Sequence, residues 1–207
     1  AVASHIPYSM HVAGGVLKTS AGDFIQAFRL GGASFESADD DQLNNWHERL
    51  NVTWRNIASP NVALWVHVIR RRERFAGEAV KETDFAGRLA AKYQKRLATE
   101  TLMVNDLYLS VVYRPVAGAA SGLVSKAMAR RPRHRGEEDL DAALDSCTKL
   151  GQTVDASLAR YEPDPLEIYL HHGRHYSRLL EFLALLVNGE FQRMPVPRAP
   201  LAEALAT

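Results

Sequence analysis

The chain has 207 residues, of which 46% are hydrophobic and 24% charged, with 25 Lys and Arg against 24 Asp and Glu. This length and balance are typical of one soluble globular domain with its own core. A chain of this size buries about 70% of its unfolded surface, so it needs neither a metal nor a disulfide to fold. The net charge of +1 gives no general pull towards an anionic partner.

The cysteine count and the hydropathy pattern exclude a disulfide-stabilised protein and a membrane-spanning one. Cys147 is the single cysteine, which excludes a disulfide framework and favours a reducing compartment, and we interpret it as a small buried apolar residue. The best apolar run, Leu179 to Val187, falls well short of the roughly 20 residues of a membrane-spanning helix and contains Glu181. The start of the sequence, residues 1–6, has none of the features of a signal peptide.

The first third of the sequence predicts a hairpin followed by a helix. Residues 16–18 and 24–30 read as strands around a turn at 20–23. Ser34 to Asp41 is polar and acidic, which suits the positive end of a helix. Large apolar residues then recur at three- and four-residue steps, which places them on one helix face: Leu43, Trp46, Leu50, Trp54 and Ile57.

The middle of the sequence predicts two strands and a helix. Val62 to Ile69 is apolar on both alternations, so we expect a central strand covered on both faces. Trp65 would then be a core residue, and its truncation to alanine would cost about 3–5 kcal/mol. A helix over 83–98 and a long strand over 102–113 follow.

The last part predicts helices separated by irregular segments. Residues 117–136 show no period and are interpreted as a long exposed loop. A helix over 137–161, a strand over 166–170, a helix over 176–187 and an extended proline-rich tail from 194 follow in that order. The pattern predicts an α+β (mixed α/β) fold with helices packed on a mixed or antiparallel sheet, in a single domain.

The sequence offers no catalytic, cofactor-binding or metal-binding residue. A phosphate-binding loop needs glycines followed by Lys and Ser or Thr, and no Gly-Lys-Ser or Gly-Lys-Thr occurs. No nucleophile elbow is present either. His171, His172 and His175 form the one histidine cluster. We interpret it as a solvated loop, because Gly173 and a strand-to-helix junction spoil the spacing that a helical metal site needs.

Two basic runs, residues 70–74 and 126–135, are the candidate binding features. Such runs bind phosphates of nucleic acid or anionic lipid, or dock proteins. Acidic residues at 137–141 cancel much of the field of the second run. We expect residues 117–135 to form an arm that docks at a membrane face. The candidate docking residues are Arg70, Arg71, Arg72, Leu123, Lys126, Met128, Arg130 and Arg131.

Several strings, taken together, resemble the amino-terminal region of the CagE/TrbE/VirB family of type IV secretion and conjugation ATPases. They occur in the order expected for the family and cover nearly the whole chain. The strings are Ile6-Pro7-Tyr8-Ser9 with His11-Val12, the segment 34–40, the strand 64–69 running into Arg70-Arg71-Arg72, the segment 104–109 ending at Arg114-Pro115, the segment 180–190, and the segment 195–201.

The resemblance implies a cytoplasmic protein, peripheral to the bacterial inner membrane, that energises pilus biogenesis and transfer of DNA or protein. It implies an assembly domain over residues 1–193 and a linker over 194–207 towards a RecA-like ATPase domain. ATP and Mg²⁺ are expected only in that later domain, so this segment itself is expected to be non-catalytic. The implied partners are inner-membrane secretion subunits and further copies of the ATPase. The alternative is a module that contacts nucleic acid through the runs 70–74 and 126–135.

Overall fold

The computed structural model describes residues 2–73, 84–115 and 133–206, with the side chains of 133–139 left out of the description. The chain forms two compact units. Unit 1 comprises Ala1–Val66 and Tyr108–Thr207, and unit 2 comprises His67–Leu107. Each unit is described by itself below.

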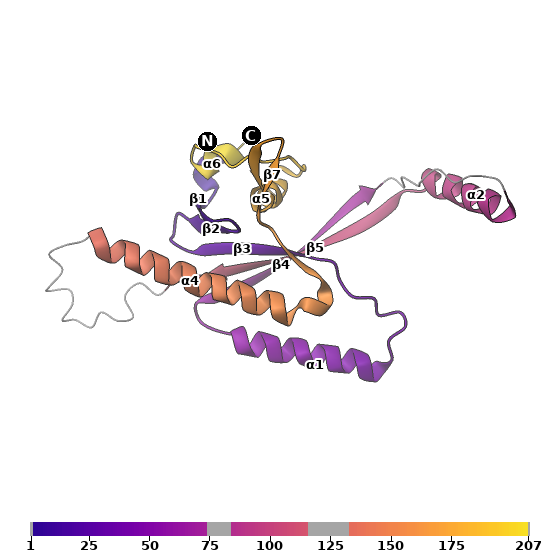
Figure 1. Ribbon diagram of the computed structural model, residues 1–207, viewed down its shortest axis with the longest axis horizontal. Helices are drawn as coiled ribbons and strands as arrows, with labels where there is room; N and C mark the ends of the chain where they lie inside the picture. Colours follow the sequence, from indigo (N-terminus) through magenta and orange to yellow (C-terminus); the bar gives the residue numbers. More distant parts are fainter. Residues whose placement is uncertain (1, 74–83, 116–132, 207) are drawn as a thin grey trace. The chain divides into compact units, whose positions relative to one another are not determined.

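The elements are those of an α+β fold, which confirms the predicted fold class (Figure 1). The helices are α1 (Asp40–Ile57), α2 (Phe85–Thr99), α4 (Arg133–Ser157), α5 (Arg178–Asn188) and α6 (Leu201–Leu205), with 3₁₀ turns η1 (Val2–His5) and η2 (Ala159–Tyr161). The strands are β1 (Tyr8–Ala13), β2 (Val16–Thr19), β3 (Phe24–Leu30), β4 (Val62–Glu73), β5 (Leu102–Tyr113), β6 (Pro163–Pro165), β7 (Ile168–His171) and β8 (Arg174–Ser177). The main sheet has the order β1-β2-β3-β5-β4, and β6 pairs with β3.

Strand β3 lies at the centre of unit 1. It pairs antiparallel with β2 at its start and with β6 at its end, and β5 is its other neighbour. Its first five residues, Phe24 to Phe28, are all buried. The predicted hairpin over 16–30 is therefore confirmed, and its second strand is covered on both faces.

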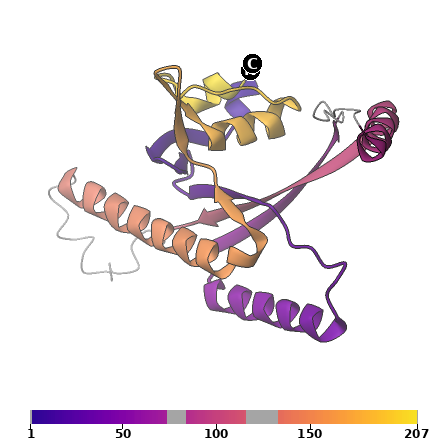
Figure 2. The same cartoon turned by 45° about the vertical axis from the view of Figure 1, so that its right-hand side comes forward.

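Helices α1 and α4 cover one face of this sheet (Figures 1 and 2). Val154 of α4 and Leu158, which follows the end of this helix, pack with Phe28 of β3 and with Leu109 and Val111 of β5. The apolar stripe of α1 joins the same cluster through Leu50, Trp54 and Ile57. Towards the start of α4, Leu140, Leu144 and Cys147 pack with Val16 and Phe24. The predicted stripe of α1 and the apolar residues of α4 thus face the core.

Helix α5 contacts the opposite face. Tyr108, which alternates with the core residue Leu109, stacks on Phe182 of α5 with ring centroids 4.5 Å apart. Ser177 caps the start of α5, because its Oγ accepts a hydrogen bond from the amide of Leu180 at 3.2 Å. Gly189 ends the helix in the left-handed conformation, at φ 75°. The predicted stop at residues 188–189 is confirmed.

Strand β4 corrects the prediction of a central strand. In the part of the chain that the structure describes, β4 is the last strand of the sheet order, next to β5 alone. Leu64 packs partly against the core, whereas Trp65 is 61% exposed and Val66 65% exposed. The prediction that Trp65 is a core residue is therefore wrong. Apolar residues on both alternations reflect here a strand at the end of the sheet, not one between two covered faces.

The segment before α5 differs from the predicted single strand over 166–170. β7 and β8 form an antiparallel hairpin whose tip is His172 and Gly173, both with positive φ. This geometry is that of a two-residue type I′ turn, for which a glycine at the second position is typical. Because β8 takes up Tyr176 and Ser177, α5 begins two residues later than predicted.

Two further boundaries differ from expectation. Helix α4 begins at Arg133, inside the predicted loop over 117–136, and residues 116–132 lie outside the described residues. The proline-rich tail is extended and packs on unit 1. The amide of Val196 donates to the carbonyl of His175 at 2.9 Å, and Leu201 and Leu205 of α6 are buried. The predicted role of residues 194–207 as a linker to a further domain stays a prediction.

The close approach of α4 to β3 generates the first testable prediction. A Cβ added at Gly151 would lie 2.1 Å from Oε1 of Gln26, a buried side chain whose Nε2 donates to the Cys147 carbonyl at 2.7 Å. Gly151→Ala gains about 1 kcal/mol of helix propensity. It also displaces Gln26, and overpacking with loss of a buried hydrogen bond costs more. We expect a net loss of about 1–3 kcal/mol in the free energy of unfolding.

A double-mutant cycle provides the control. In a Gln26→Ala background the clash is absent, so Gly151→Ala should be neutral or stabilising when unfolding is followed in urea. An equal loss of stability in both backgrounds would show that Gln26 is not what keeps residue 151 small.

Candidate docking surfaces

The basic run of β4 lies in unit 2. Arg70, Arg71 and Arg72 are all exposed. Arg71 is held in place: its Nε lies 2.5 Å from Oδ2 of Asp106 on β5, and its second contact is Glu73 at 2.9 Å. The hydrogen bond to Asp106 raises the pKa of Arg71 above its ordinary value. Arg71 therefore cross-links β4 and β5, and its charge is partly neutralised within the chain.

The second group of predicted docking residues lies outside the described residues. This applies to Leu123, Lys126, Met128, Arg130 and Arg131, and to Arg74 of the first run. The docking arm over 117–135 stays a prediction.

Helix α2 of unit 2 exposes a row of large apolar side chains that the sequence interpretation did not single out as a surface. Phe85, Leu89 and Tyr93 stand at four-residue steps and are 73%, 56% and 62% exposed. The less exposed side of the same helix carries Gly87, which is buried, and Ala91. Phe85, Leu89 and Tyr93 thus face outward, and Gln94 and Leu97 lie half-buried with the small residues on the other side.

A second exposed apolar feature lies in unit 1. Trp65 and Val66 stand on β4, the last strand of the sheet among the described residues. The outer edge of such a strand presents N–H and C=O groups that a further strand can pair with. Trp is also a residue type that contributes strongly to protein interfaces. Trp65 and the strand edge beside it are therefore a candidate docking surface.

The histidine cluster lies on the β7–β8 hairpin of unit 1. His172 and His175 are exposed, and Nε2 of His171 lies 2.5 Å from Nη1 of Arg193. No group of three metal-ligating side chains occurs in the described parts of the chain. The interpretation as a solvated loop is corrected in one respect, since these histidines stand on a hairpin.

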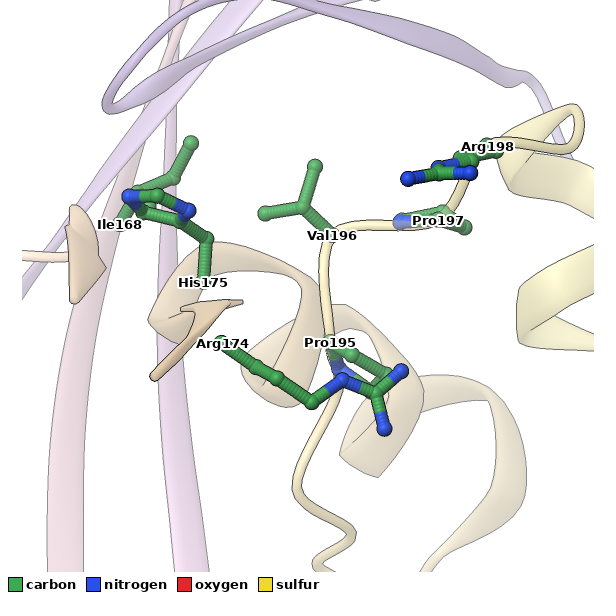
Figure 3. Close-up of a pocket in the computed structure, with 7 residues that line it drawn as sticks. All are labelled: Ile168, Arg174, His175, Pro195, Val196, Pro197 and Arg198. Atoms are coloured by element: carbon green, nitrogen blue, oxygen red, sulfur yellow. The ribbon is translucent and has the colours of Figure 1, made fainter. Parts of the chain in front are cut away.

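A pocket of about 670 Å³ lies between β8 and the tail of unit 1 (Figure 3). Figure 3 shows the Arg198 guanidinium near Pro197 and that of Arg174 near Pro195, so the two cations do not converge on one point. Its lining is open and has no carboxylate. The residues are Ile168, Arg174, His175, Pro195, Val196, Pro197 and Arg198. This geometry lacks the convergent polar groups of a built ligand site.

Cys147 is inaccessible, as the sequence predicts. Its side chain is fully buried between α4 and the sheet. Burial raises the pKa of its thiol from 9.0 to about 12, because a thiolate would be desolvated there. The thiolate is the nucleophilic form, so this residue is a core residue and not a reactive one.

An α+β domain with exposed apolar side chains on a strand edge and on a helix is typical of an interaction domain. Comparison with known proteins identifies the family of this chain. Residues 15–120 match the model of the family described as type IV secretion system ATPase VirB4/TrbE, N-terminal domain. The chain belongs to this family. The resemblance found in the sequence is thus confirmed.

Similar proteins include VirB4 of Brucella suis, 35% identical over 213 residues and matching 100% of this chain, and VirB4 of Bartonella quintana, 32% identical over 203 residues and 97% of this chain. The type IV secretion system protein PtlC homolog of Bordetella bronchiseptica is 34% identical over 211 residues. The chain spans about a quarter of the length of these relatives, 25–26%. Among the helices that the structure describes, none has the length and hydropathy to cross a bilayer.

The buried thiol generates a prediction on pH. Because the folded pKa of Cys147 lies above the 9.0 of a free thiol, the fold favours the protonated form. This contribution to stability is complete below pH 9 and is lost as the pH rises from 9 to about 12. We expect a thiol reagent at pH 8 to leave native protein unmodified and to modify one thiol per chain in denaturant. Rapid stoichiometric labelling of native protein would contradict the burial of Cys147.

Proposed function

We propose that this chain is the assembly and docking domain of a type IV secretion ATPase, and that it positions the motor against inner-membrane subunits of the secretion system. The proposal includes a peripheral location at the inner membrane and self-association of the full-length ATPase. ATP and Mg²⁺ would bind in a later domain, since this sequence has no phosphate-binding loop. Family membership supports the proposal in its general form.

The observation that carries the docking role is the exposure of Trp65 on β4. A folded domain gains nothing from presenting a tryptophan to water at 61% exposure, because burial of its apolar surface is favourable. The strand edge beside it offers backbone hydrogen bonds, and Trp65 and Val66 offer apolar area. Addition of a partner strand would use both, with pairing giving affinity and side-chain contacts giving specificity.

The alternative function, a module that contacts nucleic acid, depends on the two basic runs. Arg71 is engaged by Asp106 and Glu73, and most of the run 126–135 lies outside the described residues. No described contact favours the alternative over docking. A steep fall of DNA affinity with salt concentration remains its diagnostic measurement.

The docking proposal predicts that Trp65→Ser separates association from folding. Because the side chain is exposed, the free energy of unfolding should change by no more than about 0.5 kcal/mol. Co-purification of the full-length ATPase with inner-membrane secretion subunits should fall by about tenfold or more, as for the loss of an interface tryptophan. Val52→Ser on α1, at 48% exposure, is the matched control and should leave co-purification unchanged.

Two results would count against this role. Unchanged co-purification of the Trp65→Ser protein would remove β4 from the docking surface. A loss of about 3 kcal/mol or more in stability would show that Trp65 is buried after all.

A further inference from the structure

Helix α2 carries two adjacent rows on its outward side. Phe85, Leu89 and Tyr93 form the apolar row. Arg88, Lys92 and Arg96, all exposed, form the cationic row. Each cation stands three residues after an apolar member, so the two rows are neighbours on the helix surface.

The charge of α2 has one sign. Its fifteen residues include four Lys and Arg and no Asp or Glu. The described residues of unit 2, 67–73 and 84–107, hold seven Lys and Arg against four Asp and Glu, a difference of three positive charges. The whole chain has a net charge of only +1. The excess positive charge of this unit is thus local.

The packing of α2 places these rows outward. Asp84 caps the helix, since its Oδ1 accepts from the amide of Gly87 at 2.7 Å. The side opposite the two rows holds Gly87, which is buried, and Ala90, Ala91, Gln94 and Leu97, which are half-buried. In the described part of unit 2 the helix is thus seated through this side, and Phe85, Leu89 and Tyr93 stay exposed.

We propose that α2 lies on an anionic membrane surface, with Phe85, Leu89 and Tyr93 inserted among the lipids and Arg88, Lys92 and Arg96 against the phosphates. A helix with aromatic and aliphatic residues on one side and Lys and Arg beside them binds the interface of an acidic bilayer. Long basic side chains reach the headgroups while their stems cover apolar area. The inference names the membrane-facing element of the peripheral location proposed above and rests on that location, not on docking through β4.

The form of the surface favours lipid over a protein partner. The apolar side chains project from a single helix, and no residue of unit 2 lines the pocket between β8 and the tail. A protein would need a matching acidic groove to receive such a row. A fluid bilayer receives it without one.

Flotation of the 207-residue chain with lipid vesicles tests the proposal. We expect binding to vesicles that contain phosphatidylglycerol and little binding to pure phosphatidylcholine at roughly 0.15 M salt. Leu89→Asp should weaken the partitioning by about tenfold or more, because it removes apolar area and adds a negative charge. The double variant Arg88→Glu and Lys92→Glu should weaken it by a similar factor, and more salt should weaken the wild type.

Matched variants on α1 separate a local contact from a general effect of charge. Val52→Asp repeats the apolar-to-acidic change at an exposed site, and Arg49→Glu with Arg55→Glu repeats the charge reversal. These controls should float like the wild type. Thermal melting of all variants confirms that they are folded.

Three outcomes would overturn the proposal. The first is that the α2 variants float as well as the wild type in every lipid, and the second is that wild type and controls bind neutral vesicles equally well. The third is absence of vesicle binding together with loss of co-purification in the α2 variants, which would make α2 a protein-docking helix. Each leaves docking through β4 to be decided separately by Trp65→Ser.

Discussion

The structure of unit 1 depends on the burial of β3 under α4. Phe24, Gln26 and Phe28 point to that helix, and Ile25 and Ala27 point to the other face. Because β3 buries apolar area on both faces, it stabilises the packing of a layer on each of them. The buried Gln26 is satisfied by the Cys147 carbonyl, and Gly151 gives it room. A polar residue in this core is thereby tolerated and sets how closely α4 approaches.

Within unit 1, the side chains of a strand are less buried the further the strand lies from β3. Leu109 and Val111 of β5 are buried, whereas on β4 only Leu64 reaches the core and Trp65 faces solvent. In unit 2 the large residues of α2 face outward as well. Both units thus retain apolar side chains that their own packing does not use. These exposed side chains are the basis of the docking role and of the lipid contact proposed above.

The sequence predicts most of the fold because apolar residues recur with a clear helical period. The steps from Leu43 to Ile57 identify the inner face of α1, and the acidic start at Asp39 caps it as expected, with Oδ1 accepting from the amide of Gln42 at 2.7 Å. Trp65 shows where this reasoning fails. A period reports which side chains share a face, and not whether another layer covers that face.

The exposed row of α2 could not be predicted for the same reason: a period does not show which side of a helix is covered. The period of Phe85, Leu89, Tyr93 and Leu97 predicts the helix but not which of its sides packs, and of these four only Leu97 is half-buried. Gly87 and Ala91 on the opposite side were the signal that the helix could be seated the other way round. The β7–β8 hairpin is hard to predict because its strands have only four residues each, and Gly173 at its tip is the one turn signal in its sequence.

The central claim is that β4 and α2 become covered when the ATPase is assembled at the membrane. Hydrogen exchange of the full-length ATPase, free and in membranes that contain its secretion subunits, tests it directly. The account predicts slower exchange on assembly in peptides covering 62–66 and 85–99, with the outer face of α1 unchanged. Equal exchange of β4 and α2 in the free and assembled states would contradict it.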